Sequence, residues 1–140
     1  MTVRAFVVHW DPATLAEKEA VVIAAGAQVV GAEASDGRRA HDEVRRLVPD
    51  VLVVWLSWKP SHGRVTAAAI RATSWGRKIT ILFVDDPATP AATLARLKAV
   101  VPDAIVDVPT RLPFWVGKVA ALPGQSIPQA GDPLAPASNP

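Results

Sequence analysis

Cysteine is absent from the 140 residues of this sequence, and its absence excludes several kinds of chemistry. Without thiols the chain forms no disulfide, no cysteine-ligated zinc site, no iron–sulfur cluster and no thiol nucleophile. Long apolar runs are lacking too, since runs such as Val51 to Leu56 fall far short of the roughly 20 residues that a membrane helix needs. The apolar stretch between Arg4 and Asp11 is too short for a secretory signal. We therefore expect a cytoplasmic protein without membrane contact.

Blocks of one charge are also missing. The formal net charge is +2 and no run of five like charges occurs, so the chain has no electrostatic tail of the kind that binds nucleic acid. The densest basic group lies within residues 38–46, where four arginines are interleaved with Asp42 and Glu43. We interpret this group as the solvated face of a helix, and we expect no nucleic-acid partner.

Proline is concentrated at one end of the chain. Residues 123–140 contain five prolines and only two large apolar side chains, Ile127 and Leu134. Such a segment buries too little apolar surface to offset the entropy of ordering it. The sequence therefore predicts a folded domain over residues 1–122 and a disordered proline-rich tail over residues 123–140.

Strand-like and helix-like segments alternate along residues 1–122. Short apolar, β-branched segments predict five strands, at residues 3–8, 28–31, 51–56, 79–84 and 104–108. Capping signals and apolar spacing predict five helices, over residues 11–26, 35–48, 63–73, 89–101 and 113–122. Asp11 and Pro12 mark the start of the first helix, and the third carries Val65, Ala69 and Ile70.

This alternation predicts an α/β fold, a three-layer sandwich with a five-stranded parallel sheet. The third and fourth strands are apolar throughout, as buried central strands should be. With right-handed crossovers, the expected strand order is 2-1-3-4-5. A functional site is then expected beyond the carboxyl ends of the strands, between the first and the third.

Residues 26–56, which read GAQVVGAEASDGRRAHDEVRRLVPDVLVVWL, resemble the receiver domain of two-component response regulators. The features are a glycine that closes the first helix, VVGAEASDGRRA at the second strand and helix, and PD before the third strand. Residues 59–71, KPSHGRVTAAAIR, resemble the loop and helix that follow. The likeness covers about residues 3–120 and weakens after residue 90. It implies a flavodoxin-like, CheY-like sandwich.

The resemblance also implies where a phosphorylation site would lie, and this sequence departs from it. A receiver has an acidic pair at the end of the first strand, where this chain has His9 and Trp10, with Asp11 beside them. A receiver has its phospho-accepting aspartate in the third strand, at the position of Trp55. An indole supplies neither a carboxylate nucleophile nor the hard oxygen ligands that magnesium requires.

Two later positions depart as well. Asp85 falls where a receiver has serine or threonine, and Val108 falls where a receiver has lysine before a proline. We predict that Trp10, Trp55 and Trp58 fill the pocket with apolar volume. The resemblance then implies a non-phosphorylatable pseudo-receiver with no catalytic residue, no metal and no cofactor.

Acidic side chains at the strand ends leave two alternatives open. Asp11, Asp85 and Asp86 could bind a divalent cation weakly, and a phosphate-accepting receiver could use Asp11 or Asp85 instead of the third-strand position. We favour helix capping by Asp11 and a turn at Asp85, Asp86 and Pro87, because these residues begin loops.

Enzyme motifs are not evident. His9, Ser57 and His62 could supply a nucleophile and a base, but no G-x-S-x-G turn surrounds Ser57, which lies in WLSWKP. No glycine-rich phosphate-binding motif follows the first strand. We therefore expect a protein that is not an enzyme.

Two adjacent aromatic residues, Phe114 and Trp115, begin the fifth predicted helix. Neighbours in a helix cannot both face the core, so one of them either marks a partner surface or packs at an edge. In receivers the fourth helix, fifth strand and fifth helix form the usual interaction face. We predict a protein partner in a signalling pathway, with a homodimer as one option. The alternative is a small-molecule sensor that uses the tryptophan-lined crevice as its ligand pocket.

Overall fold

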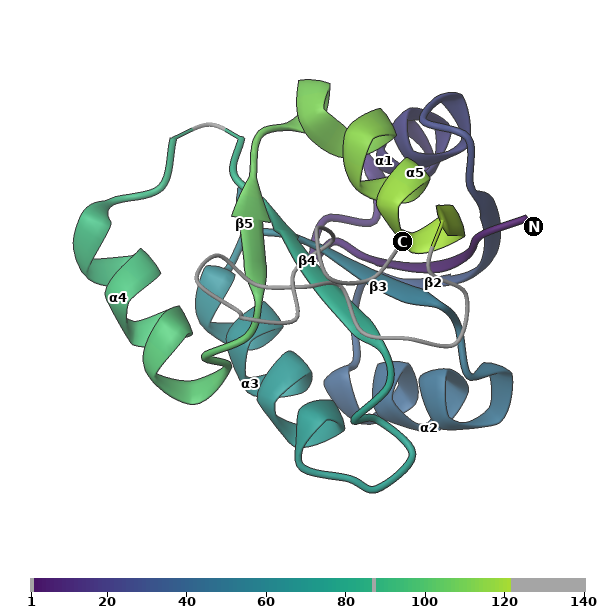
Figure 1. The fold of residues 1–140 in the computed structure, drawn as a ribbon. Helices are drawn as coiled ribbons and strands as arrows, with labels where there is room; N and C mark the ends of the chain where they lie inside the picture. Colours follow the sequence, from purple (N-terminus) through teal and green to yellow (C-terminus); the bar gives the residue numbers. More distant parts are fainter. Residues whose placement is uncertain (1, 87, 122–140) are drawn as a thin grey trace, which may run out of the picture.

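The computed structural model describes residues 2–86 and 88–121, and a five-stranded parallel sheet lies at its centre (Figure 1). The strands are β1 (Arg4–Val8), β2 (Gln28–Glu33), β3 (Val51–Trp55), β4 (Thr80–Val84) and β5 (Ile105–Asp107). The helices are α1 (Leu15–Ala24), α2 (Gly37–Leu47), α3 (Pro60–Arg71), α4 (Ala91–Val100) and α5 (Leu112–Ala121), with a 3-10 turn, η1 (Pro109–Arg111), before α5. The strand order is β2-β1-β3-β4-β5, which confirms the predicted fold class and order.

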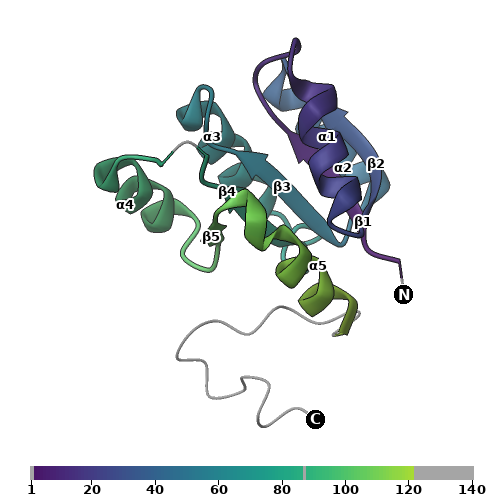
Figure 2. The same ribbon diagram turned by 90° about the horizontal axis from the view of Figure 1, so that it is seen from above.

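Helices cover both faces of the sheet, and each face has its own apolar core. In Figure 1, α1 and α5 lie above the sheet while α2 and α3 lie below it, and Figure 2 shows α1 and α5 crossing over the strands. Every residue of β3 is buried, because successive side chains of a strand point to opposite faces and both faces are covered here. Leu52 and Val54 pack on the α2–α3 side, and Val51 and Val53 pack on the α1–α5 side.

The first helix begins later than the sequence predicts. Residues 11–14 form a turn in which the Thr14 amide donates to the Asp11 carbonyl at 3.2 Å, and α1 starts at Leu15. The Asp11 carboxylate accepts from the Ala13 amide and the Thr14 hydroxyl, so it stabilises this turn instead of capping the helix. The expected capping by Asp11 is therefore wrong in its position.

The third helix begins earlier than predicted, with Pro60 in its first turn, where a missing amide costs nothing. Its buried residues are Gly63, Thr66, Ala67 and Ile70, which lie on one helical face. Val65 lies off that face and is 64% exposed.

The sequence offers Ser35 or Asp36 as the cap of the second helix, and Asp36 is the cap in the structure. The Asp36 carboxylate accepts from the amides of Arg38 and Arg39, at 2.9 and 3.2 Å. The predicted tail at residues 123–140 lies outside the described residues, as does Pro87. Within the part of the chain that the structure describes, no helix combines the length and apolarity needed to cross a membrane.

Candidate functional site

The carboxyl ends of β1, β3 and β4 bring most of the predicted site residues to one edge of the sheet. His9 and Trp10 follow β1, Trp55 is the last residue of β3, and Asp85 follows β4. His9, Trp10 and Trp55 are all buried. The edge where a functional site was expected is therefore formed mainly by two indoles and an imidazole.

Trp55 closes the third strand on the α1–α5 side of the sheet. Its side chain is 1% exposed and belongs to the core that α1 and α5 cover. The His9 ring meets it edge-on with centroids 6.4 Å apart, and the Lys18 ammonium lies 5.8 Å from the ring centroid. An imidazole and a cation therefore lie beside the buried Trp55 ring.

Trp10 lies on the opposite side of the sheet. It packs in the core that α2 and α3 cover, with the His62 ring 6.0 Å away between centroids. Two glycines lie near it: a Cβ on Gly63 would be 3.6 Å from the indole nitrogen, and a Cβ on Gly37 would be 3.9 Å from the far ring carbon, both ordinary van der Waals distances. The sheet therefore separates Trp10 from Trp55.

Trp58 belongs to neither core, and Trp10 and Trp55 lie on opposite sides of the sheet, so the expectation that three tryptophans fill one pocket is wrong. The Trp58 side chain is 52% exposed. The strand ends at Trp55, and the chain then turns through Lys59, which adopts a left-handed φ of 47°, before α3 begins. Beyond the strand the regular alternation of side chains is lost, and this turn leaves the third indole at the surface.

His9 is held by a short chain of hydrogen bonds. Its Nε2 lies 2.7 Å from the Thr14 hydroxyl, which itself donates to the Asp11 carboxylate at 2.8 Å. Because that hydroxyl gives its proton to Asp11, it accepts from His9, and the imidazole carries its proton on Nε2. Burial lowers the pKa of His9, and the nearby Lys18 charge lowers it further against the opposing effects of Asp11 and Glu17. The imidazole is therefore neutral near neutral pH.

Two acidic residues of this edge, Asp11 and Asp85, are engaged in turns, and Asp86 is exposed. Asp85 accepts from the Thr89 amide at 2.6 Å, and Asp11 is used by the turn before α1. Within residues 2–86 and 88–121, no three histidine, aspartate or glutamate side chains cluster closely enough to hold a metal ion. These contacts support local roles for both carboxylates.

Val108 follows β5, and its side chain is exposed. Its amide donates to the Asp107 carboxylate at 2.8 Å, immediately before η1 begins at Pro109. This position therefore presents an uncharged, apolar side chain to solvent.

Phe114 and Trp115 lie in the first half of α5 and differ in exposure, as predicted for adjacent residues of a helix. Phe114 is 41% exposed, and its ring lies 4.2 Å from the Arg111 guanidinium and 5.3 Å from the Lys118 ammonium. Trp115 turns inward, and its indole nitrogen donates to the Asp107 carboxylate at 2.8 Å. Phe114 is therefore the exposed aromatic residue of the pair.

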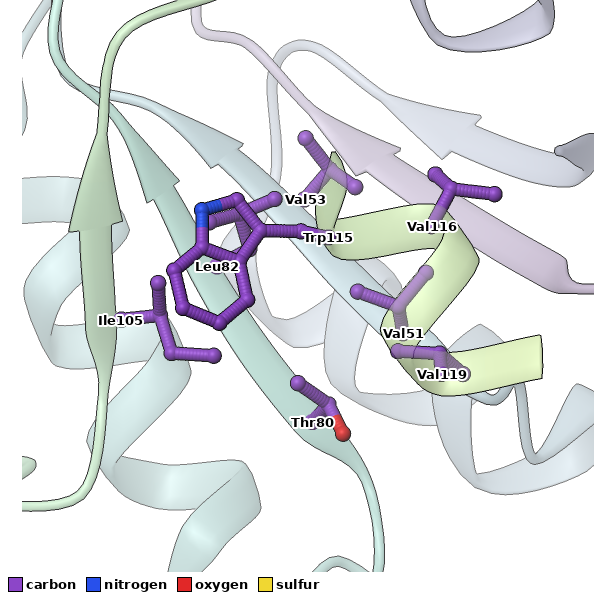
Figure 3. Close-up of a pocket in the computed structure, with 8 residues that line it drawn as sticks. All are labelled: Val51, Val53, Thr80, Leu82, Ile105, Trp115, Val116 and Val119. Atoms are coloured by element: carbon purple, nitrogen blue, oxygen red, sulfur yellow. The ribbon is translucent and has the colours of Figure 1, made fainter. Parts of the chain in front are cut away.

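Figure 3 shows how the Trp115 indole closes the core beside β5. The ring lies over β4, between α5 and Ile105 of β5, above an apolar hollow of about 10 Å³ that also borders Thr80 and Val119. That volume holds about one water-sized sphere. The helix thus packs closely against the sheet and leaves no room for a ligand there.

Asp107 is a candidate functional residue that the sequence alone did not reveal. Burial acts to raise the pKa of Asp107, but hydrogen bonds from Trp115, Val108 and Arg111, with the Arg111 charge, outweigh burial and lower it. The spacing of Asp107, Arg111 and Trp115, four residues apart each time, is a signal that could have revealed this group.

Comparison with known proteins connects this architecture to receiver domains. No protein-family model matches the sequence, and no curated protein does. Among solved structures, the chain is similar to the chemotaxis protein CheY4 of Vibrio cholerae, with 20% identity, a TM-score of 0.66 and coverage of 85% of this chain and 99% of that one. It is also similar to the receiver domain of the putative response regulator NarL from Mycobacterium tuberculosis, with 21% identity, a TM-score of 0.61 and coverage of 86% and 98%.

A third similar structure is a two-component response regulator of the LuxR family from Aurantimonas, with 23% identity and a TM-score of 0.64. That match covers 95% of this chain and 91% of the other. At these identities the likeness is one of fold. The protein has the CheY-like fold of response-regulator receiver domains.

Proposed function

We propose that the protein is a pseudo-receiver, which cannot be phosphorylated and acts in cytoplasmic signal transduction by binding other proteins. The burial of Trp55 at the end of β3 is the observation that carries this proposal. An indole there offers no oxygen nucleophile, and it occupies the α1–α5 side of the strand end.

The neighbouring groups support the same conclusion. Phosphoryl transfer with magnesium requires several hard oxygen ligands around one carboxylate. Two carboxylates at this edge of the sheet, those of Asp11 and Asp85, are engaged in turns, and His9 is neutral and buried. Among the described residues, no three histidine, aspartate or glutamate side chains form a group that could hold a metal ion.

A surface for protein contact is available at the end of β5 and the start of α5. Phe114 and Val108 are apolar and exposed, and Arg111 and Lys118 flank the Phe114 ring. Exposed aromatic side chains beside arginine are typical of residues that contribute strongly to protein interfaces. We propose this surface for a signalling partner or for a second copy of the chain.

Phosphorylation is tested by incubating the protein with acetyl phosphate and magnesium and measuring intact mass, with an active receiver treated in parallel. We expect no phosphoryl adduct on this chain. A phosphoryl adduct that mapped to Asp11 or Asp85 would refute the pseudo-receiver proposal.

The interaction surface is tested separately by capture of partners with Phe114→Ala protein. Ile23→Ala is the matched control, because Ile23 is also apolar, 57% exposed and helical, but lies on α1. We expect Phe114→Ala to lose partners, or a dimer in light scattering, that Ile23→Ala keeps. Equal recovery by both variants would refute this surface.

Small-molecule sensing is a second candidate, because Trp10 and His62 line a hollow of about 240 Å³ at the carboxyl ends of the strands. Ligand pockets usually enclose about 300–1,000 Å³, so this hollow is small for a nucleotide or a flavin. We therefore favour protein contact. Quenching of tryptophan emission by a nucleotide or flavin at micromolar concentration would favour the sensor instead.

A further inference from the structure

The outer side of α5 carries an exposed strip, which we call the α5 strip. Phe114, Gly117 and Ala121 are exposed there and Lys118 is half-buried, while the buried residues of α5 lie on the opposite side of the helix. A Cβ on Gly117 would meet nothing within 4 Å, so no described part of the chain covers the strip at that point. The strip therefore leads without obstruction from the Phe114 ring to the last residue of α5.

The charge beside the Phe114 ring is positive. The Arg111 guanidinium lies 4.2 Å from the ring centroid, and the Lys118 ammonium lies 5.3 Å from it. Asp107 also adjoins this surface, but its carboxylate already accepts from Arg111 and from Trp115. No ion pair between described residues involves Lys118. Lys118 is therefore the cation of the strip that can pair with a further carboxylate.

The chain that follows α5 carries a matching segment. Residues 122–140 contain one charged side chain, Asp132, which lies in DPLAP, residues 132–136, beside the large apolar side chain of Leu134. Prolines favour an extended conformation with a rise of about 3.1 Å per residue, so Asp132 and Leu134 would be about 6 Å apart. That spacing is close to the 5.3 Å between the Lys118 ammonium and the Phe114 ring centroid.

The connection is long enough for this segment to reach the strip. Phe114 lies about 10 Å from Ala121 along the helix, at 1.5 Å per residue. Leu134 lies thirteen residues beyond Ala121, and a flexible chain of that length spans about 20 Å on average. Pro123 and Gly124 form a pair typical of turns, which would let the chain reverse. Such a tether gives an effective concentration on the order of millimolar, so a weak contact is sufficient.

From these observations we infer that residues 132–136 of this chain dock on its own α5 strip, with Leu134 against the Phe114 ring and Asp132 paired with Lys118. The tail buries too little apolar surface to fold alone, but here Leu134 leaves water against a ring that the domain already holds in place. The inference rests on the proposed function, because the covered surface is the one proposed for a partner. The tail then competes with the partner and lowers its apparent affinity.

The test is an NMR measurement on the full-length protein. Protons that lie over the face of an aromatic ring resonate upfield, so we expect the Leu134 methyl signals upfield of their positions in the urea-unfolded chain. Phe114→Leu should abolish this shift, because it removes the ring and keeps an apolar side chain. Trp58→Leu is the matched control, because it removes another exposed aromatic side chain, and it should leave the shift intact.

Variants of charge test the ion pair. Asp132→Lys and Lys118→Asp should each reduce the upfield shift, and the two changes together should restore it. Added salt should also reduce the shift, because exposed charges are screened. Ile127→Ser is the control within the tail, because Ile127 is large and apolar but lies outside residues 132–136, and it should retain the shift. Circular dichroism checks that each variant is folded.

Several outcomes would overturn the inference. These are Leu134 methyl signals at their unfolded positions in the unmodified protein, a shift that Phe114→Leu retains, or a shift that Trp58→Leu abolishes. A contact within one chain is independent of protein concentration. A shift that declines on tenfold dilution would therefore assign the contact to a second copy and refute docking within the chain.

Capture of partners separates this inference from the proposed function. Leu134→Ser should increase recovery of partners by about twofold, which is the gain expected when half of the molecules are covered. Equal recovery by Leu134→Ser and the unmodified protein, where Phe114→Ala loses partners, would refute the competition and leave the proposed surface standing. An upfield shift of Leu134 together with full recovery by Phe114→Ala would refute the proposed surface and support the docked tail.

Discussion

The indole nitrogen of Trp115 donates a 2.8 Å hydrogen bond to the carboxylate of Asp107, which joins α5 to the end of β5. Arg111 binds the same carboxylate oxygen at 3.2 Å from the turn between them. The bond holds Trp115 inward over the sheet and leaves Phe114 facing solvent between two cations. One internal contact therefore determines which aromatic side chain the surface presents.

We predict that Trp115→Phe lowers the free energy of unfolding by about 1–3 kcal/mol, because it removes this bond to a charged acceptor. Phe114→Leu should change it by no more than about 0.5 kcal/mol, since Phe114 is exposed. Urea denaturation measures both. Equal stability of Trp115→Phe and the unmodified protein would contradict the role assigned to the bond.

The pKa of Asp107 is lowered on folding. Its contribution to the stability of the fold is therefore present above the unfolded value of 3.8 and is lost as the pH falls through the lower folded value.

His9 should make the protein sensitive to mild acid. Burial lowers the pKa of His9 below its ordinary 6.5, so the unfolded chain binds this proton more readily than the folded one. Stability should therefore be full above about pH 6.5 and decrease as the pH falls from there through the folded pKa. Urea denaturation at several pH values measures the slope.

The matched variants for this prediction are His9→Gln and His62→Gln. His9→Gln should flatten the slope below about pH 6.5, and His62→Gln, which changes a surface imidazole of α3, should retain it. A slope that survives in His9→Gln would show that another group titrates.

Replacement of Trp55 or Trp58 by alanine should lower the free energy of unfolding by very different amounts. Trp55→Ala should cost about 3–5 kcal/mol, because it opens a cavity in the core beneath α1 and α5. Trp58→Ala should cost no more than about 0.5 kcal/mol, because half of that side chain is already in solvent. Similar losses of stability in the two variants would mean that the Trp58 side chain is buried in solution.

Gly31 should not tolerate a methyl group. A Cβ there would lie 2.7 Å from the Phe6 ring and 3.0 Å from a Leu47 methyl group, so Gly31→Ala should cost about 1–3 kcal/mol. Gly117 in α5 has nothing within 4 Å of such a Cβ, and Gly117→Ala should stabilise the helix by about 0.5–1 kcal/mol. Thermal unfolding of the two variants should shift in opposite directions, and a shared direction would contradict the packing described around Gly31.

The sequence alone was enough to predict the α/β class, the strand order, a helix cap at Ser35 or Asp36 and the buried third strand. These features depend on local signals, namely the spacing of apolar side chains, capping residues and the handedness of crossovers. Its resemblance to receiver domains indicated the same fold, and the solved structures confirm that fold.

The positions of particular side chains needed the tertiary structure. The apolar residues Trp58 and Val65 suggest burial in the sequence, yet each lies where the loop or helix turns it to solvent. Asp11 reads as a helix cap but stabilises the turn before α1 through Thr14. Local pattern determines which segments form strands and helices. Which face of a loop or helix becomes buried depends on the elements packed against it, and those come from distant parts of the chain.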